Sequence, residues 1–566
     1  MALADFCSCK ICIHAILGVR AAAKPPWMGL RRSSTGIPHS LKSAKLLKLG
    51  IAGVYIQHTL GKNEFSVMLS DFPTYSLSNH FKMRHANLVE SFQSILPTES
   101  VLYETEDLKP YECDGLSAYR QLPMIAVLPG NEAEIIEILK ICEAEKIPVV
   151  ARGAGTGLSG GALPHADGVL LSLAKLNEIL EIDPVACTAR VQPGVRNLAI
   201  SEAAEAYGLY YAPDPSSQIA CTIGGNVAEN SGGVHCLKYG LTVHNILKLR
   251  VLTIEGDVLE IGSEALDSPG FDLLALMSGS EGMLGIITEI TVKLLPIPEA
   301  AQLVMAAFDD IEKAGAAVAN IIRAGIVPAG LEMMDKMTIA AVEAFIHAGY
   351  DPDAAAIVLC ESDGSNEAVA EEIEKIRGIM RESGAVRIDT ARGEAERRRF
   401  WAGRKAAFPA AGRVSPDYYC MDGTIPRKHL AEVLRRIEDL SSEFGLRCMN
   451  VFHAGDGNLH PLILYDANRS GELEKAEAFG ARILEICIEA GGSLTGEHGV
   501  GIEKLNQMCL QFGDAERDLF HAVKAAFDPD SLLNPGKAIP SLHRCAEFGA
   551  MHVHRGDEQF PDLPRF

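Results

Sequence analysis

The sequence contains no long hydrophobic run. Nowhere among its 566 residues do 18 apolar residues follow one another, so it indicates no membrane-spanning helix. It also has fewer basic than acidic residues, 52 against 74, which gives a net charge of -22. This argues against general nucleic-acid binding. Among the 14 scattered cysteines only Cys7, Cys9 and Cys12 form a tight group. Because no second group completes a four-ligand set, we expect no iron–sulfur or structural zinc site in this chain.

The composition is that of a folded, multidomain protein. Hydrophobic residues make up 48% and charged residues 22%, which excludes a largely disordered or collagen-like chain, and the length predicts two or three domains. Residues 1–84 are basic, with 11 Lys and Arg against 3 Asp and Glu. We expect them to be a disordered or non-native extension, with Met83 as a candidate start and an organelle-targeting segment as the alternative.

From about residue 110 the pattern alternates between helix and strand. Residues 132–146 repeat apolar side chains at a helical period. Short buried strands are expected at 147–150, 169–173 and 188–191, a hairpin at 247–261, a strand at 286–295, and helices at 197–207, 392–404, 427–444 and 471–490. The prolines at 296 and 298 suggest a domain boundary. The resulting divisions are 1–84, 85–298, 299–525 and 526–566.

A glycine-rich loop follows the strand at 147–150. It contains Gly155-x-Gly157-x-x-Gly160, formally a dinucleotide fingerprint, which requires a helix to start in the loop. Only seven residues, one of them Pro164, separate Gly161 from the strand at Val169, and a βαβ crossover needs a dozen or more. The spacing therefore predicts strand–loop–strand. Such a loop either holds a pyrophosphate on exposed backbone N–H groups or is a structural turn.

Two further segments have small side chains suited to close approach of a flat ligand. They are residues 213–233, which include Gly224-Gly225-Asn226, and residues 279–288, which include Glu281-Gly282. Three such segments within about 140 residues favour a ligand site over isolated turns.

The stretch His453-Ala-Gly-Asp-Gly-Asn-Leu-His460 predicts a hairpin. Asp456-Gly457 is a preferred two-residue turn, and such a turn would place His453 directly opposite His460. With Glu497 as a third ligand, two histidines and a carboxylate are typical of a catalytic metal. A pair of hydrogen-bonded core histidines is the alternative.

Together these segments resemble the vanillyl-alcohol-oxidase/PCMH-type FAD flavoproteins, in the branch of FAD-linked 2-hydroxy-acid dehydrogenases. Residues 111–120 and 546–554 are similar to the flavin-bearing subunits of bacterial glycolate oxidases. The resemblance covers the chain from about residue 105. It implies an α+β protein: a PCMH-type FAD-binding domain of two α/β subdomains, an α/β substrate (cap) domain, and a C-terminal helical region that returns to the flavin.

The resemblance also implies which residues bind FAD. The cofactor-binding positions are Arg152, Gly153, Ala154, Gly155, Thr156, Gly157, Leu158, Ser159, Gly160, Gly161, Pro213, Ser217, Thr222, Gly224, Gly225, Asn226, Asn230, Glu281, Gly282, Gly285, Ile286, Ile287 and Asn534.

By the same resemblance, His453, His460 and Glu497 bind a divalent metal such as Zn, Mn or Fe. His498 matches the general base and Arg404 the residue that binds the substrate carboxylate. The stretch 417–420 lacks a lysine found near this point in 2-hydroxyglutarate enzymes, and Leu462 replaces their asparagine. Both departures favour a short substrate.

The function implied is oxidation of glycolate to glyoxylate, with hydride passing to flavin N5. Electrons would leave through a second flavoprotein subunit and an iron–sulfur subunit. The protein would lie in the cytoplasm or peripherally on the inner face of the cytoplasmic membrane. The alternatives are a stand-alone D-lactate dehydrogenase, a non-catalytic electron-carrying flavin subunit, and a metal-dependent hydrolase without flavin.

Overall fold

The computed structural model describes residues 54–58, 65–69, 75–265 and 270–541. The cysteine group at 7–12 and the tail segment 546–554 lie outside these residues. The described chain forms two compact units that divide after Phe81. In the first, β1 (Val54–His58) pairs antiparallel with β2 (Phe65–Leu69). Helix α2 (Tyr75–Gln93) includes residue 84, so no end of a helix or strand marks the domain boundary expected there. That boundary stays a prediction. No described helix is both long and apolar enough to cross a membrane.

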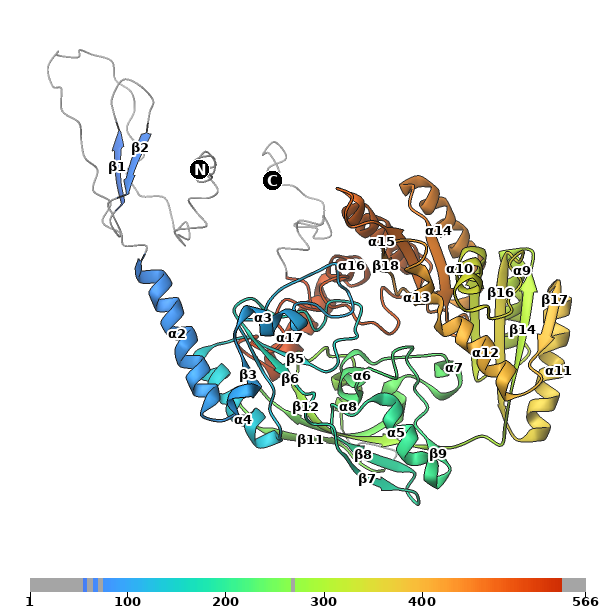
Figure 1. The fold of residues 1–566 in the computed structure, drawn as a ribbon, viewed down its shortest axis with the longest axis horizontal. Helices are drawn as coiled ribbons and strands as arrows, with labels where there is room; N and C mark the ends of the chain where they lie inside the picture. The colour runs from blue at the N-terminus through green and yellow to red at the C-terminus, as the bar shows by residue number, and fades with distance from the viewer. Residues whose placement is uncertain (1–53, 59–64, 70–74, 266–269, 542–566) are drawn as a thin grey trace, which may run out of the picture. The chain divides into compact units, whose positions relative to one another are not determined.

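A four-stranded sheet begins the second unit (Figure 1). Its strands, in the order β3-β4-β6-β5, are β3 (Val101–Leu102), β4 (Ile125–Val127), β6 (Val169–Ser172) and β5 (Val149–Arg152). Helix α4 (Glu132–Glu145) begins where the Asn131 side chain accepts from the Glu134 N–H, and it ends at Lys146 with φ of 51°. Ile135, Ile138 and Leu139 of α4 pack in the core of this sheet. The helix predicted at 132–146 and the strand predicted at 169–173 are confirmed, and the strand predicted at 147–150 lies two residues later, at 149–152.

Strands β5 and β6 are parallel neighbours, and residues 153–168 join them without a helix. The strand–loop–strand prediction is therefore confirmed, and the dinucleotide-fingerprint interpretation of this loop is excluded.

A five-stranded antiparallel sheet follows, in the order β11-β10-β12-β8-β7. The strands are β7 (Ile179–Asp183), β8 (Thr188–Val191), β10 (Ile246–Leu252), β11 (Val258–Gly262) and β12 (Ile286–Lys293). The helices are α5 (Asn197–Ala204), α6 (Ile223–Glu229), α7 (Cys236–Tyr239) and α8 (Leu273–Met277), and β9 (Leu209–Tyr210) pairs with β13 (Leu295–Pro296). The predicted hairpin is β10–β11, whose turn contains Gly256 with φ of 85°.

The third sheet has seven strands in the order β17-β14-β16-β15-β19-β20-β18. They are β14 (Ala300–Phe308), β15 (Gly330–Asp335), β16 (Ala356–Gly364), β17 (Arg387–Thr390), β18 (Asp417–Cys420), β19 (Cys448–Phe452) and β20 (Pro461–Tyr465). Along β14, Val304 and Ala306 face one core and Leu303 and Met305 the other, because successive side chains of a strand point to opposite faces.

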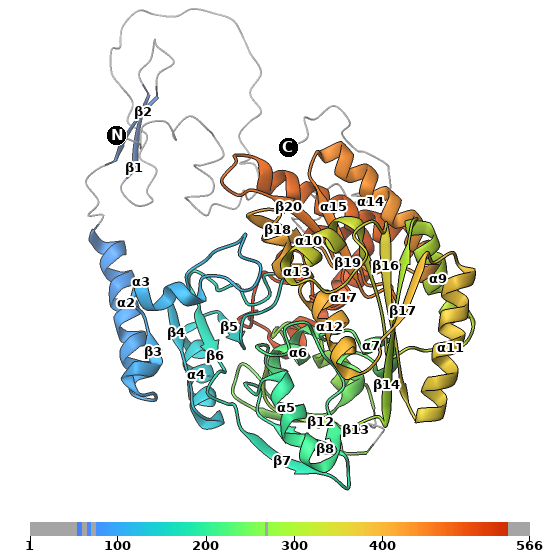
Figure 2. The ribbon, with the colours of Figure 1, turned by 45° about the vertical axis from the view of Figure 1, so that its right-hand side comes forward.

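Helices cover both faces of this sheet (Figure 2). Side chains from four helices build one core, and those helices are α9 (Ile311–Arg323), α11 (Asn366–Glu382), α14 (Leu430–Phe444) and α15 (Glu472–Glu489). The other core contains α10 (Lys336–Ile346), α12 (Glu394–Lys405) and α13 (Ala407–Ala411). Further short elements are helix α3 (Thr105–Leu108) and the 3-10 turns at Thr98–Ser100, Lys109–Tyr111, Glu205–Tyr207, Thr242–Asn245 and Arg427–His429.

The C-terminal region returns to the first sheet. After α16 (Leu505–Gln511) and α17 (Asp514–Phe527), Leu533 forms a parallel bridge with Val149 of β5. The Val149 N–H donates to the Leu532 carbonyl, and the Asn534 N–H donates to the Val149 carbonyl. This segment thus lies beside the strand that leads into the glycine loop, as the predicted fold class requires.

Candidate functional site

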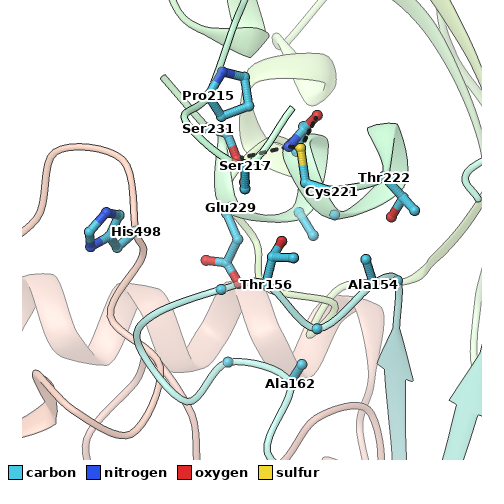
Figure 3. A pocket seen from close by; sticks show the side chains of 18 of the residues that line it. Ala154, Thr156, Ala162, Pro215, Ser217, Cys221, Thr222, Glu229, Ser231 and His498 are labelled. Atoms are coloured by element: carbon cyan, nitrogen blue, oxygen red, sulfur yellow. Dashed lines mark hydrogen bonds between the residues drawn. The ribbon is translucent and has the colours of Figure 1, made fainter. Parts of the chain in front are cut away.

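A cavity of about 470 Å³ lies where the glycine segments meet the cap elements (Figure 3). Most of the predicted cofactor-binding residues line it: Arg152, Gly153, Ala154, Gly155, Thr156, Gly157, Leu158, Gly161, Ser217, Thr222, Gly224, Gly225, Asn226, Glu281, Gly282, Gly285 and Ile287. The cap side contributes Lys405, Phe408, Pro409, His460, Glu497 and His498. One cavity therefore joins the glycine segments to the histidine hairpin.

The glycine loop has the properties of an anion site. In the described chain, no backbone N–H from Gly153 to Gly161 donates a hydrogen bond to another protein group. The buried Nη1 of Arg152 also lacks a partner. Unpaired donors beside a cavity suit a pyrophosphate, which accepts several hydrogen bonds. The donor set therefore fits FAD.

Small side chains keep the cavity wide. Gly225 lies on α6, and a Cβ built there would meet only the Thr222 Oγ1, at 3.5 Å. Larger side chains at this position would project into the cavity, so the glycine is explained by the space it leaves.

Six predicted cofactor-binding residues do not line the cavity: Ser159, Gly160, Pro213, Asn230, Ile286 and Asn534. Asn534 lies behind it, where its Nδ2 donates to the carbonyls of Gly161 and Glu281, at 2.9 and 2.6 Å. It ties two lining segments together. The direct FAD contacts expected of these six residues stay predictions.

Fourteen lining residues were not among the predicted ones: Ala151, Ala162, Leu173, Pro193, Pro215, Ser216, Cys221, Ala228, Glu229, Ser231, Ser280, Lys405, Phe408 and Pro409. Glu229 is chemically the most unusual of them, because its buried Oε2 has no hydrogen-bond partner. Burial, and then the nearby Glu281, raise its pKa well above the usual value. A buried carboxyl is easily overlooked in the sequence, since neighbouring Ala228 and Asn230 suggest only a helix end.

The histidine hairpin forms with a register different from the predicted one. His453, rather than pairing with His460, pairs with Asn458, and the Gly457 N–H donates to the His453 carbonyl. Gly457 has φ of 79°, and its ideal Cβ would meet the Ile425 carbonyl oxygen at 2.1 Å. The two-residue turn prediction is therefore wrong. Four residues, 454–457, connect the paired residues His453 and Asn458.

The two histidines nevertheless meet. Their ring centroids are 5.2 Å apart, since a shift of two residues keeps side chains on the same face. His453 Nε2 and His460 Nε2 each lie 3.2 Å from Glu497 Oε1. His460 Nε2 makes no hydrogen bond of acceptable geometry. Three ligand atoms that converge in this way fit a divalent cation with open coordination positions.

A buried carboxylate orients His453 from behind. Glu332, on β15, accepts from His453 Nδ1 at 2.7 Å. Its other oxygen accepts from Arg404 Nε at 2.7 Å. A carboxylate on the second ring nitrogen is the usual support for a metal-binding histidine. Arg404 is 1% exposed and does not line the cavity, so its predicted contact with substrate stays a prediction and its observed contact is with Glu332.

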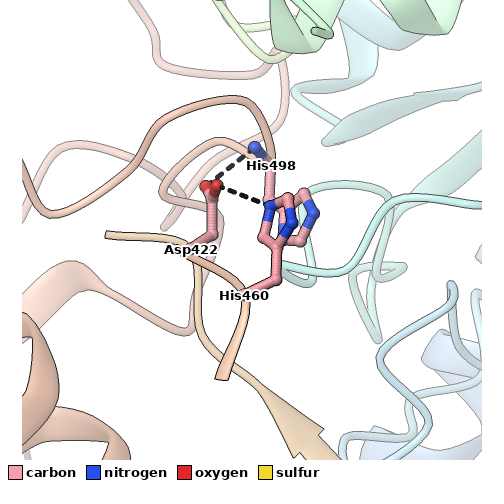
Figure 4. A group of neighbouring side chains, drawn as sticks. All are labelled: Asp422, His460 and His498. Atoms are coloured by element: carbon pink, nitrogen blue, oxygen red, sulfur yellow. Dashed lines mark hydrogen bonds and ion pairs between the residues drawn. The ribbon is translucent and has the colours of Figure 1, made fainter. Parts of the chain in front are cut away.

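A second buried carboxylate, Asp422, holds the loop that carries Glu497 and His498 (Figure 4). It accepts from the backbone N–H groups of Gly496 and His498, at 3.0 and 2.9 Å. The Lys504 ammonium lies 3.3 Å away. Although Asp422, His460 and His498 also converge, Asp422 Oδ2 already has these donors, and its Oδ1 accepts from Asn458 Nδ2 at 2.8 Å. We therefore assign Asp422 to positioning.

His498 presents an available ring to the cavity. The ring stacks on that of His460, with centroids 4.9 Å apart, and its buried Nδ1 has no hydrogen-bond partner. Burial lowers the pKa of His498 to about 4, so the imidazole is neutral near pH 7. A neutral imidazole beside a cavity can accept a proton.

Comparisons with known proteins agree with this geometry. Residues 123–262 match the FAD binding domain family, and residues 297–538 match the family of FAD linked oxidases, C-terminal domain. The chain is 64% identical over 471 residues to the glycolate oxidase subunit GlcD of Escherichia coli (strain K12), covering 83% of this chain and 94% of that protein. It is 41% identical over 428 residues to GlcD of Bacillus subtilis, covering 75% and 91%.

More distant proteins share the fold or the family. A D-lactate dehydrogenase of Anaerostipes hadrus is 33% identical over 468 residues, covering 80% of this chain and 98% of that protein. The structure of p-cresol methylhydroxylase with substrate bound matches with a TM-score of 0.70 at 18% identity, covering 82% and 98%. That likeness establishes the PCMH-type fold. The sequence matches place the chain in the FAD-linked oxidase family, and it is a FAD-dependent oxidoreductase.

Proposed function

We propose that this chain is the flavin-bearing, substrate-oxidising subunit of a glycolate oxidase, converting glycolate to glyoxylate. One observation carries the proposal: the glycine-lined cavity for FAD continues to His460, Glu497 and His498. The identity to GlcD supports this substrate class over D-lactate, whose dehydrogenase is the more distant relative. The departures at 417–420 and Leu462 also favour a short acid.

The cofactors divide the chemistry between them. FAD supplies the two-electron acceptor, held by the glycine loop and by the segments around Gly225 and Gly282. The proposed metal, held by His453, His460 and Glu497, supplies a Lewis acid that acidifies the substrate hydroxyl; Zn, Mn and Fe all accept these ligands.

The chain's own residues position the substrate and move its proton. His498 accepts the hydroxyl proton at Nδ1, the ring atom without a partner. Glu332 and Asp422 fix the directions of His453 and of the loop that bears His498. These buried supports leave the reacting groups little freedom, which favours a productive geometry.

The reduced flavin must pass its electrons on. The described cysteines offer no clustered set for an iron–sulfur centre, and many are buried singly in apolar cores, such as Cys142 and Cys360. We propose a second flavoprotein subunit and an iron–sulfur subunit as acceptors, in the cytoplasm or peripherally at the inner face of the cytoplasmic membrane.

We further propose residues 85–298 as the FAD domain, 299–525 as the cap and 526–566 as the closing segment.

Substrate oxidation is tested by anaerobic absorbance of the purified chain. We expect glycolate to bleach the flavin band near 450 nm, and D-lactate to bleach it more slowly. Faster bleaching by D-lactate would show that D-lactate, rather than glycolate, is the preferred substrate. A flavin that neither acid reduces, even with the partner subunits present, would favour a non-catalytic electron carrier.

The FAD cavity is tested by filling it. Gly225→Leu should nearly abolish FAD binding, because the side chain occupies cavity space, while a glycine-to-leucine change favours the helix. FAD content is measured from absorbance after denaturation, and folding by circular dichroism. The control is Gly378→Leu on α11, where a Cβ meets nothing within 4 Å. Normal FAD content in Gly225→Leu would place the cofactor elsewhere.

A further inference from the structure

Lys405 is a positive side chain on the cap side of the cavity. It occupies the last turn of α12, is exposed, and lines the cavity together with Phe408 and His460. Among the described residues, no carboxylate forms an ion pair with its ammonium. After His235, the charge of Lys405 helps to lower the pKa of the buried Asp214 carboxyl, but no ion pair holds the ammonium there, so it can reach a ligand.

The preceding residue has its charge neutralised. Arg404 is fully buried, and its Nε donates to Glu332, while its buried Nη2 has no hydrogen-bond partner. Successive residues of a helix point about 100° apart, so the two cations face different surroundings. Arg404 faces the support of His453, whereas Lys405 faces the cavity.

The cavity itself is rich in carboxyl groups. Glu229, Glu281 and Glu497 all line it. A 2-hydroxy acid brings a further carboxylate, and moving that anion out of water is costly unless a cation receives it. On the cap side of the described cavity, Lys405 is the lysine or arginine side chain that offers such a charge.

We infer that the Lys405 ammonium binds the substrate carboxylate and so selects anionic 2-hydroxy acids; this rests on the proposed function. The neighbouring rings place this ammonium on the reactive side of the cavity. Phe408 follows Lys405 by three residues and its ring contacts His460, with centroids 6.3 Å apart. His460 in turn stacks on His498. The carboxylate would thus lie toward Lys405 and the hydroxyl toward His498.

The test compares Lys405→Met with Lys405→Arg in the full-length, FAD-loaded chain. We expect Met to raise the KM for glycolate about 10- to 100-fold, the range for a lost charged hydrogen bond, with a smaller effect on kcat. Arg should recover much of the loss. Wild type should prefer glycolate to the neutral glycolamide, and Lys405→Met should lose most of that preference. The control is Arg398→Met on the same helix, whose side chain is 76% exposed and which should behave as wild type.

Oxalate binding separates this inference from the proposed function. Oxalate carries carboxylates but no oxidisable hydroxyl, and its binding is followed through the flavin spectrum. A 10-fold or greater loss of oxalate affinity in Lys405→Met supports the inference even if wild type fails to oxidise glycolate. Unchanged glycolate KM and oxalate affinity would overturn it. So would a changed flavin reduction potential with unchanged affinities, since the ammonium would then serve the flavin.

Discussion

Replacing Glu497 by glutamine is expected to abolish glycolate oxidation while FAD remains bound. The substitution removes the carboxylate whose Oε1 lies 3.2 Å from both His453 Nε2 and His460 Nε2. Loss of a Lewis acid worth several kcal/mol lowers turnover roughly 10³-fold or more. Metal content is measured by elemental analysis, FAD by absorbance, and turnover by anaerobic flavin reduction. We expect metal to fall to background in parallel with turnover.

Glu332→Gln provides a graded comparison. The amide keeps the shape behind His453 but weakens the hydrogen bond to Nδ1, and such supports are worth about 10- to 100-fold in metal affinity. The variant should regain activity at high metal concentration, whereas Glu497→Gln should not. A Glu497→Gln protein with wild-type metal and turnover would show that the cluster is a set of hydrogen-bonded core histidines.

Replacing His498 by asparagine is expected to lower kcat by about 10²- to 10⁴-fold, the usual contribution of a positioned general base. FAD and metal content should be unchanged, because His498 is neither a predicted FAD contact nor one of the three proposed ligands. Stopped-flow bleaching by glycolate measures the reductive step directly, and glycolate deuterated at carbon 2 reports whether hydrogen transfer still limits it.

The matched control for His498 is His429→Asn, in the 3-10 turn Arg427–His429, where the histidine side chain is 33% exposed; this change should leave bleaching unchanged. A His498→Asn protein that is bleached as fast as wild type would remove His498 from the chemistry. If Glu497 also proved dispensable, the chain would be an electron-carrying subunit without a substrate site of its own.

Local patterns predicted the flavin side of the molecule well. The helix at 132–145 follows from its apolar period, and the short interval between Gly161 and Val169 correctly excluded a crossover helix. Glycines leave a backbone that a ligand can approach closely, so the segments that line the cavity are visible in the sequence. Their roles toward FAD follow from the family resemblance.

The hairpin register was not predictable from its turn residues alone. Asp456-Gly457 favours a two-residue turn, but Gly457 packs against the Ile425 carbonyl, where an ideal Cβ would lie 2.1 Å from the oxygen. The Ile425 N–H also donates to the Gly457 carbonyl at 2.9 Å, a tertiary contact that the local turn pattern does not contain. The prediction that the two histidines lie close together is correct although the predicted register is wrong, because both registers place the histidines on one face.

The buried supports of the site were missed because they lie far away in the sequence. Glu332 precedes His453 by 121 residues and belongs to β15, which pairs with β19. Asp422 precedes the His498 N–H that it binds by 76 residues. Neither stands in a local motif, and only the strand order of the sheet brings them to the histidines.

The bridge between Val149 and Leu533 has a consequence for biosynthesis. The edge of the first sheet emerges from the ribosome some 380 residues before the segment that pairs with it. A nascent chain therefore carries the glycine loop long before Asn534 can tie Gly161 to Glu281. The two parts that these contacts join are therefore brought together only at the end of synthesis, after the whole cap that lies between them in the sequence has been made.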